Sequence, residues 1–150
     1  MDYEFLIKDL NLIKTQKAIG TDKGLAKIGD GIVNLTYSVA KSAYLTTSNS
    51  NSTILRTGVK VSKKILSTAL KISDLKKFAK TRADAHDLAD TAEALIAYVW
   101  LSREMSLDEI IDFLFKNLSG DLNVRNEEIT NATEAFTKLL IHIKRFLPVK

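Results

Sequence analysis

The stretch Leu25–Val33 reads LAKIGDGIV, and the stretch Ala89–Ile96 reads ADTAEALI. Each places carboxylates inside a run of residues that otherwise favours burial. A buried charge is unfavourable unless it is paired or holds a metal ion. Two such stretches, roughly sixty residues apart in the sequence, therefore predict one divalent-ion site assembled from two elements of the fold.

The apolar residues around these stretches recur with the period of an α-helix. The chain has one proline and six glycines in 150 residues, which leaves long uninterrupted segments. The sequence therefore predicts an all-α bundle of six or seven helices. We expect these helices at Tyr3 to about Gln16, Lys23 to about Thr46, about Gly58 to Ile72, Asp74–Lys80, Asp84 to about Glu104, Ser106 to near Leu118, and about Asn126 to Phe146.

Local patterns make these expectations more specific. Thr21 or Asp22 can cap the second helix, and Ser106 with Glu109 has the pattern of a capping box. The polar run Thr47–Thr53 predicts an exposed, mobile loop. The apolar seams that should face the core are Phe5, Leu6, Leu10, Leu12 and Ile13 in the first helix, Leu25, Ile28, Ile32, Leu35 and Val39 in the second, and Val59, Val61, Ile65, Leu66 and Leu70 in the third.

Composition excludes several classes of protein. The chain has no cysteine, which excludes disulfides and thiolate metal sites. No apolar run approaches the roughly 18 residues of a membrane span. The N-terminal sequence MDYEFLIKDL is acidic and amphipathic, unlike a signal peptide. We therefore expect a single domain over residues 1–150, located in the cytoplasm and not in a membrane.

Charge is unevenly distributed along the chain. Arg56–Arg82 contains nine basic residues and one acid, whereas Ala83–Phe113 contains eight acids and one base. One interpretation is a surface that grips a polyanion beside a cation-binding pocket. The other is that two solvated helix faces simply pair with each other.

Gly29, Asp30 and Gly31 lie inside the second predicted helix. A glycine in a helix interior costs about 1 kcal/mol relative to alanine, so each glycine should allow a close approach, either of another helix or of a bound ion and its phosphate. The alternative is a tight Gly-Asp-Gly turn between two shorter helices, with Asp30 as a cap.

Asp87, Asp90 and Glu93 are spaced three residues apart, which puts them on one face of a helix. Acids near a helix start also complement its dipole, and this alternative suits Asp84 and Asp87. Glu93 lies further inside, among apolar residues, where its charge requires a partner. A site whose ligands are all oxygen atoms favours Mg²⁺ or Mn²⁺, and such ions suit phosphodiester hydrolysis.

Two segments carry a resemblance to a known family. LAKIGDGIVNL at 25–35 resembles the signature of the ribonuclease III catalytic domain, and LADTAEALIAYVWL at 88–101 resembles that domain's second motif. The resemblance covers roughly Lys23 to Leu101 and implies a ribonuclease III-like endonuclease domain. By position, it makes Asp30, Asp90 and Glu93 ligands of Mg²⁺ (or Mn²⁺), with Asp30 and Glu93 catalytic.

The chain also departs from the family's pattern. The full-length enzymes have glutamates where this chain has Lys23 and Ala26, and a glycine where it has Ala97. Ala26 resembles the compact Mini-ribonuclease III branch, whereas Asp90 resembles the full-length enzymes. The chain therefore resembles a stand-alone catalytic domain, of a Mini-ribonuclease III-like or archaeal kind, without a separate RNA-binding domain and with fewer acids in its site.

The resemblance implies a Mg²⁺-dependent endoribonuclease that acts on double-stranded or structured RNA as a homodimer, with the 23–46 helix near the interface. The residues expected to grip RNA phosphates are Lys63, Lys64, Lys76, Lys77, Lys80 and Arg82. Two alternatives stay open at this point. One is a catalytically degenerate ribonuclease III-like module for RNA binding or dimerisation, and the other is an unrelated helical regulatory protein.

Overall fold

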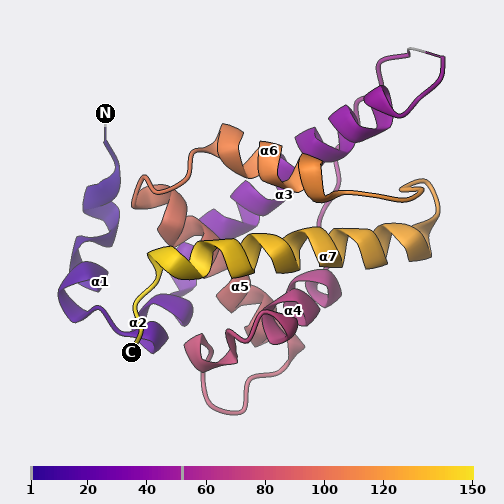
Figure 1. The fold of residues 1–150 in the computed structure, drawn as a ribbon. Helices are drawn as coiled ribbons and strands as arrows, with labels where there is room; N and C mark the ends of the chain where they lie inside the picture. The colour runs from indigo at the N-terminus through magenta and orange to yellow at the C-terminus, as the bar shows by residue number, and fades with distance from the viewer. Residues whose placement is uncertain (1, 52) are drawn as a thin grey trace.

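A computed structural model describes residues 2–51 and 53–150 and confirms the all-helical prediction. These residues form seven α-helices and three short 3-10 helices, with no strand among them (Figure 1). Ser52, in the predicted mobile loop, lies outside the described residues. The elements in order are η1 (Glu4–Ile7), α1 (Lys8–Ile13), α2 (Gln16–Gly20), α3 (Lys23–Thr47), α4 (Lys63–Ile72), η2 (Lys76–Phe78), α5 (Ala85–Leu101), α6 (Leu107–Asn117), α7 (Arg125–Ile143) and η3 (Lys144–Phe146).

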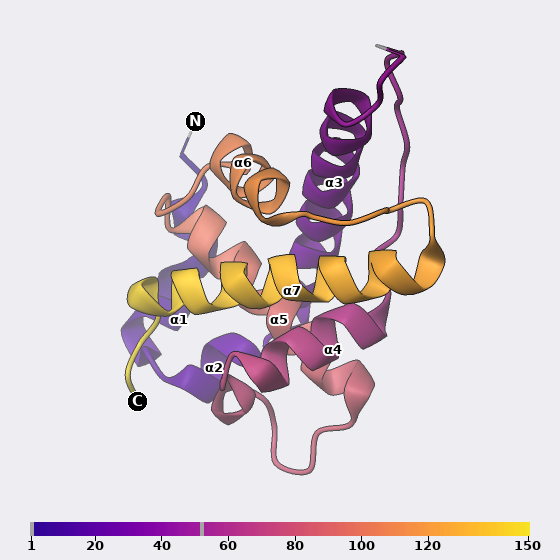
Figure 2. The same cartoon turned by 45° about the vertical axis from the view of Figure 1, so that its right-hand side comes forward.

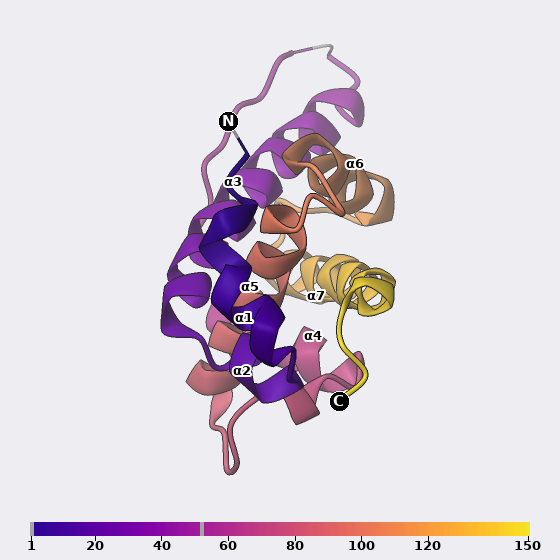
Figure 3. The same ribbon diagram turned by 90° about the vertical axis from the view of Figure 1, so that its left-hand side faces the viewer.

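Helix α5 is the centre of the bundle. Every residue from Thr91 to Val99 is buried, as expected for a helix that is apolar on all sides. Helix α3 packs along one side of α5 and α4 along another, while α6 packs on α3, and α7 lies across α4 and α6. Figures 1 and 3 show α5 enclosed by these neighbours. A carboxylate on α5 is therefore held by a rigid, fully packed element.

Side-chain caps set the helix starts that the sequence indicates. The Asp22 carboxylate accepts a hydrogen bond from the Leu25 backbone N–H at 2.8 Å at the start of α3. Reciprocal capping boxes begin α5, from Asp84 and Asp87, and α6, from Ser106 and Glu109. The expected caps at Asp22 and Ser106 are therefore confirmed. The alternative that Asp84 and Asp87 serve the helix start is also confirmed.

The predicted seam of α3 is wrong by part of a turn. Leu25 and Ile32 are buried, but Ile28, Leu35 and Val39 are 37%, 52% and 42% exposed. The buried face instead carries mainly small or polar residues, among them Ala26, Gly29, Val33, Thr36, Tyr37 and Ala40. This face is buried because its small side chains allow α3 to approach α5 closely, and the larger apolar side chains remain exposed.

The predicted N-terminal helix, Tyr3 to about Gln16, is present as η1 and α1 over residues 4–13, with a 3-10 first turn. It ends at Lys14, whose φ of 51° is left-handed, and α2 follows as a separate helix. Of its predicted core residues, Leu10 is buried, whereas Phe5, Leu6, Leu12 and Ile13 are exposed. Ile7, which the predicted seam did not include, is buried instead. The break lets α2 turn back toward the C-terminus, where the Gln16 N–H donates to the Lys150 carbonyl at 2.7 Å.

The third predicted helix starts five residues late, because α4 begins at Lys63 after its Ser62 cap. Residues 53–62 are extended instead and run alongside α3 (Figure 2). The backbone of this segment is paired with side chains of α3. The N–H groups of Leu55, Thr57, Val59 and Val61 donate to side-chain oxygens of Thr46, Ser42, Ser38 and Asn34, at 2.9, 2.9, 2.8 and 2.7 Å.

Three of these contacts are reciprocal. The hydroxyl groups of Thr46, Ser42 and Ser38 donate back to the carbonyl groups of Leu55, Thr57 and Val59, each at 3.2 Å. Four residues of a helix rise about 6 Å, and two residues of extended chain span about 6.6 Å, so the spacings nearly match. We call this arrangement the side-chain ladder and its four pairs the rungs.

Among the described residues, every helix is too short or too polar to span a lipid bilayer.

Candidate functional site

Helices α3 and α5 pack closely at Gly29. A Cβ placed on Gly29 would overlap the carbonyl group of Glu93 and lie 2.9 Å from its Cα. The glycine therefore serves the approach of another helix, one of the two roles that the sequence indicates. Helix α3 is continuous through Gly29, Asp30 and Gly31, so the alternative of a Gly-Asp-Gly turn is wrong.

This contact brings Asp30 of α3 and Glu93 of α5 together. Glu93 is 4% exposed, and both carboxyl groups line the same hollow. Burial, then a hydrogen bond with Asp30 and the negative charge of Asp30, raises the pKa of Glu93 to about 8. The partner that Glu93 requires is thus a second carboxyl group. Two acids in this arrangement favour a shared proton or a cation between them.

Asp90 lies one turn before Glu93 but has different neighbours. Lys23 Nζ is 3.3 Å from Asp90 Oδ2, and Lys63 Nζ is 3.7 Å from Oδ1. His86 Nε2 lies 3.4 Å from Oδ2 as well. Both oxygens of Asp90 are therefore engaged by groups that are or can become cationic.

In the part of the chain that the structure describes, no group of three or more His, Asp or Glu side chains is arranged to hold a metal ion. Of the predicted ligand set, the geometry joins Asp30 to Glu93, whereas Asp90 faces ammonium groups. Coordination by Asp90 stays a prediction.

The hollow has a volume of about 280 Å³ and mixes charges of both signs. Three carboxyl groups and four lysines line it. Such a lining suits a ligand that is itself anionic and brings a cation with it. The lining residues are Lys23, Ala26, Lys27, Asp30, Lys60, Lys63, His86, Asp90 and Glu93.

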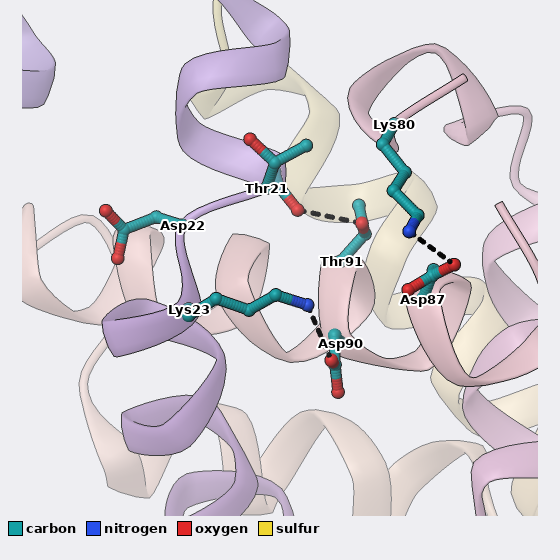
Figure 4. Close-up of a pocket in the computed structure, with 8 residues that line it drawn as sticks. Thr21, Asp22, Lys23, Lys80, Asp87, Asp90 and Thr91 are labelled. Atoms are coloured by element: carbon teal, nitrogen blue, oxygen red, sulfur yellow. Dashed lines mark hydrogen bonds and ion pairs between the residues drawn. The ribbon is translucent and has the colours of Figure 1, made fainter. Parts of the chain in front are cut away.

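A smaller hollow of about 160 Å³ adjoins the first and shares Lys23 and Asp90 with it. Figure 4 shows this second hollow, with Lys23 reaching toward Asp90 and Lys80 toward Asp87. The Lys80–Asp87 pair is 3.3 Å long. The basic and acidic stretches therefore pair with each other at Lys63–Asp90 and Lys80–Asp87, as one interpretation of the charge pattern holds.

All six residues expected to grip RNA are exposed, but they do not form one cluster. Lys63 lies at the rim of the larger hollow and Lys80 at the smaller one. Lys64 instead lines a groove between α4 and α7. The others belong to η2 and the loop after it, namely Lys76, Lys77 and Arg82.

Sequence reasoning missed three residues that contribute to this site. Lys27 and Lys60 line the larger hollow, and the Asn34 side-chain amide donates to Asp30 Oδ1 at 3.2 Å. The spacing of Lys27, Asp30 and Asn34 puts them on one side of a helix, so Lys27 and Asn34 could have been predicted to lie near Asp30. No sequence pattern places Lys60 there, because its segment is extended.

A comparison with protein-family models agrees with this geometry. The model described as Ribonuclease III matches residues 23–148, which include α3, α5 and every residue that lines the larger hollow. Among curated proteins, none matches the chain. The family match covers most of the sequence and contains both acidic segments in the helices where the structure joins them. The chain therefore belongs to the ribonuclease III family.

Proposed function

We propose that this protein is a Mg²⁺-dependent endoribonuclease that hydrolyses phosphodiester bonds in double-stranded or structured RNA. Membership of the ribonuclease III family supports RNA as the substrate class. The observation that carries the proposal is the pair of Asp30 and Glu93, brought together beside the close contact of α3 and α5 at Gly29, in a hollow lined by lysines.

The two carboxyl groups fit a single Mg²⁺ ion. Mg²⁺ is commonly held by one or two carboxylates and keeps several waters. Among the described residues, neither Asp30 nor Glu93 forms an ion pair with a lysine or arginine, so both remain available to a cation. A bound ion would polarise a phosphoryl oxygen and activate water for attack on phosphorus.

The residues around the pair bind and orient the substrate in this proposal. Lys23 and Lys63 stand at the rim with 69% and 49% of their side chains exposed, where they can contact phosphates on either side of the cleaved bond. Asp90 supports the site from the next turn of α5. Double-stranded RNA is recognised mainly through its shape, 2′-hydroxyls and phosphates, so binding should weaken steeply with salt.

The exposed apolar face of α3 supports a homodimer. Ile28, Leu35 and Val39 point outward on the same side as Gly31, where an added Cβ would have no atom within 4 Å. Large apolar side chains beside a glycine suit the close packing of a second helix. We propose that a second copy packs here. Leu35→Glu should give monomers in sedimentation measurements, and an unchanged sedimentation coefficient would contradict this arrangement.

Action as a stand-alone domain over residues 1–150 and a location in the cytoplasm stay predictions.

The decisive test is Glu93→Gln in an assay with purified protein, duplex RNA and Mg²⁺ or Mn²⁺. The variant should lose cleavage and keep near-normal RNA binding, because it removes an ion ligand but none of the lysines. Glu127→Gln, at an exposed glutamate of α7, is the matched control and should cut normally. Cleavage retained by Glu93→Gln would refute the assignment.

A second function is favoured by one observation. Lys23, at a position where full-length relatives were expected to have an acid, places its ammonium group on Asp90. The alternative is therefore a degenerate module that binds RNA without cutting it. Wild-type protein that binds duplex RNA in a salt-dependent way but cuts in neither metal would establish this alternative, and absence of RNA binding would contradict both functions.

A further inference from the structure

The first rung of the side-chain ladder reaches the candidate site. Thr46, Ser42 and Ser38 use a single hydroxyl oxygen to pair with the extended segment. Asn34, at the first rung, has an amide with separate donor and acceptor atoms. It accepts from the Val61 N–H at 2.7 Å and also donates to Asp30 Oδ1 at 3.2 Å. One side chain thus joins the extended segment to an acid of the site.

Chemistry fixes which end of the Asn34 amide faces Asp30. A backbone N–H is a donor alone, so the atom opposite Val61 must be the amide oxygen. The NH₂ group then points toward Asp30 and meets a carboxylate, which is an acceptor. Val61 is itself 4% exposed and part of the core, so the atom that orients Asn34 is held by packing.

We propose that Asn34 is a positioning residue for Asp30 and that Val61, near the end of the extended segment 53–62, holds its amide in place. This inference rests on the proposed function, because it makes Asp30 an ion ligand. A neutral donor on Oδ1 restricts rotation of the carboxylate without cancelling its charge, and it leaves the second oxygen, Oδ2, free of this hydrogen bond. Hydrogen-bonded neighbours of metal ligands commonly change metal affinity 10- to 100-fold when they are replaced.

The ladder itself supplies the variants that separate positioning from folding. Asn34→Ser should keep the rung, because serines at 38 and 42 already pair with the same kind of backbone. Its hydroxyl group, occupied by Val61, cannot also reach Asp30 as the longer amide does. Ser38→Ala is the matched control, since it breaks a rung and leaves the contact with Asp30 in place.

The first measurement needs no metal. In nuclear magnetic resonance spectra of the full chain, the Asn34 side-chain NH₂ protons should shift downfield relative to an exposed asparagine, and Asp30→Ala should remove that shift. Side-chain protons that do not respond to Asp30→Ala would overturn the inference, whatever the protein binds.

The second measurement is calorimetric titration with Mn²⁺ alone. Asn34→Ser should weaken Mn²⁺ binding by about 10- to 100-fold with a small change in thermal stability, whereas Ser38→Ala should lower thermal stability and leave Mn²⁺ affinity unchanged. Wild-type affinity in Asn34→Ser, or equal losses in the two variants, would overturn the role of Asn34 alone. Wild-type protein that binds no Mn²⁺ would overturn the proposed function, and with it any role of Asn34 toward an ion.

Discussion

Replacing Gly29 with alanine tests the geometry on which the site depends. The substitution gains about 1 kcal/mol in intrinsic helix propensity. Against this gain, the new Cβ would overlap the Glu93 carbonyl group and lie 2.9 Å from its Cα. These are backbone atoms in the middle of a packed helix, so they cannot rotate away as a flexible side chain would.

Gly31→Ala is the matched control, two residues along the same helix. Its Cβ would have no atom within 4 Å, so it should stabilise the chain by roughly 0.5–1 kcal/mol. Overpacking a core costs about 1–3 kcal/mol. Because the overlap is with backbone, we expect Gly29→Ala to reach the upper part of that range and to show a net loss of about 1–2 kcal/mol after its own propensity gain. That gain is common to both variants, so their free energies of unfolding should differ by the overpacking cost, roughly 2–3 kcal/mol, although their chemistry is identical.

Urea unfolding at equal m-value gives these free energies. The measurements should be made at a protein concentration where sedimentation shows monomers, because Gly31 lies on the face that we assign to the dimer. Gly29→Ala should also weaken Mn²⁺ binding, since pushing α3 away from α5 separates Asp30 from Glu93. The reasoning fails if Gly29→Ala is as stable as the wild type, or if it gains as much as Gly31→Ala.

Three further outcomes are expected. Glu128 is 5% exposed and accepts hydrogen bonds from Tyr37 at 2.9 Å and from Lys41, whose side chain is 12% exposed, at 2.7 Å. Glu128→Ala should therefore cost about 3–5 kcal/mol in urea unfolding, because it leaves a largely buried ammonium unpaired, whereas Glu127→Ala, at the exposed neighbour, should stay within about 0.5 kcal/mol. Burial alone would raise the pKa of Glu128, but Lys41, Tyr37 and Arg125 outweigh it and lower the pKa below 4.5. The stability that ionised Glu128 contributes should therefore be complete above pH 4.5 and be lost as the pH falls through the pKa of the folded state. A Glu128→Gln variant with the same acid unfolding as the wild type would contradict this. The pKa of Glu93 is raised from 4.5 to about 8, so the folded state holds the Glu93 proton more tightly than the unfolded state. The stability contributed by protonated Glu93 should be complete below pH 4.5 and be lost as the pH rises through about 8. Thermal melts of metal-free Glu93→Gln across that pH range should lack this loss.

Much of the fold could be predicted from the sequence because local signals determine it. Helices α5, α6 and α7 begin and end within about three residues of the expected positions, since apolar period and capping residues are read from neighbours in the chain. The proximity of Asp30 and Glu93 was also foreseeable. A glycine inside a helix indicates a close approach, and Glu93 lies too deep in its helix to be solvated.

What could not be predicted depends on contacts between distant segments. Val59 and Val61 fit a helical pattern, but their backbone is paired with hydroxyl and amide groups of α3, more than twenty residues earlier. Ile28 has the character of a core residue, yet α3 turns its small residues toward α5. The ion pairs of Asp90 could not be predicted for the same reason, because the approach of Lys23 and Lys63 depends on how α3 and α4 are placed around α5.

The ladder also predicts which insertions and deletions the protein will tolerate. The last rung joins Thr46 to Leu55. The residues that connect these two take no part in the rungs, so residues added there would lengthen the tip of the loop, away from Asp30 and Glu93. Within 55–61 the side chains alternate between the two sides of the extended segment. Removing one residue within 57–59 would put the rungs on one side of the deletion out of register with α3. Relatives of this chain should therefore vary in length at the tip and keep a fixed length along the extended segment.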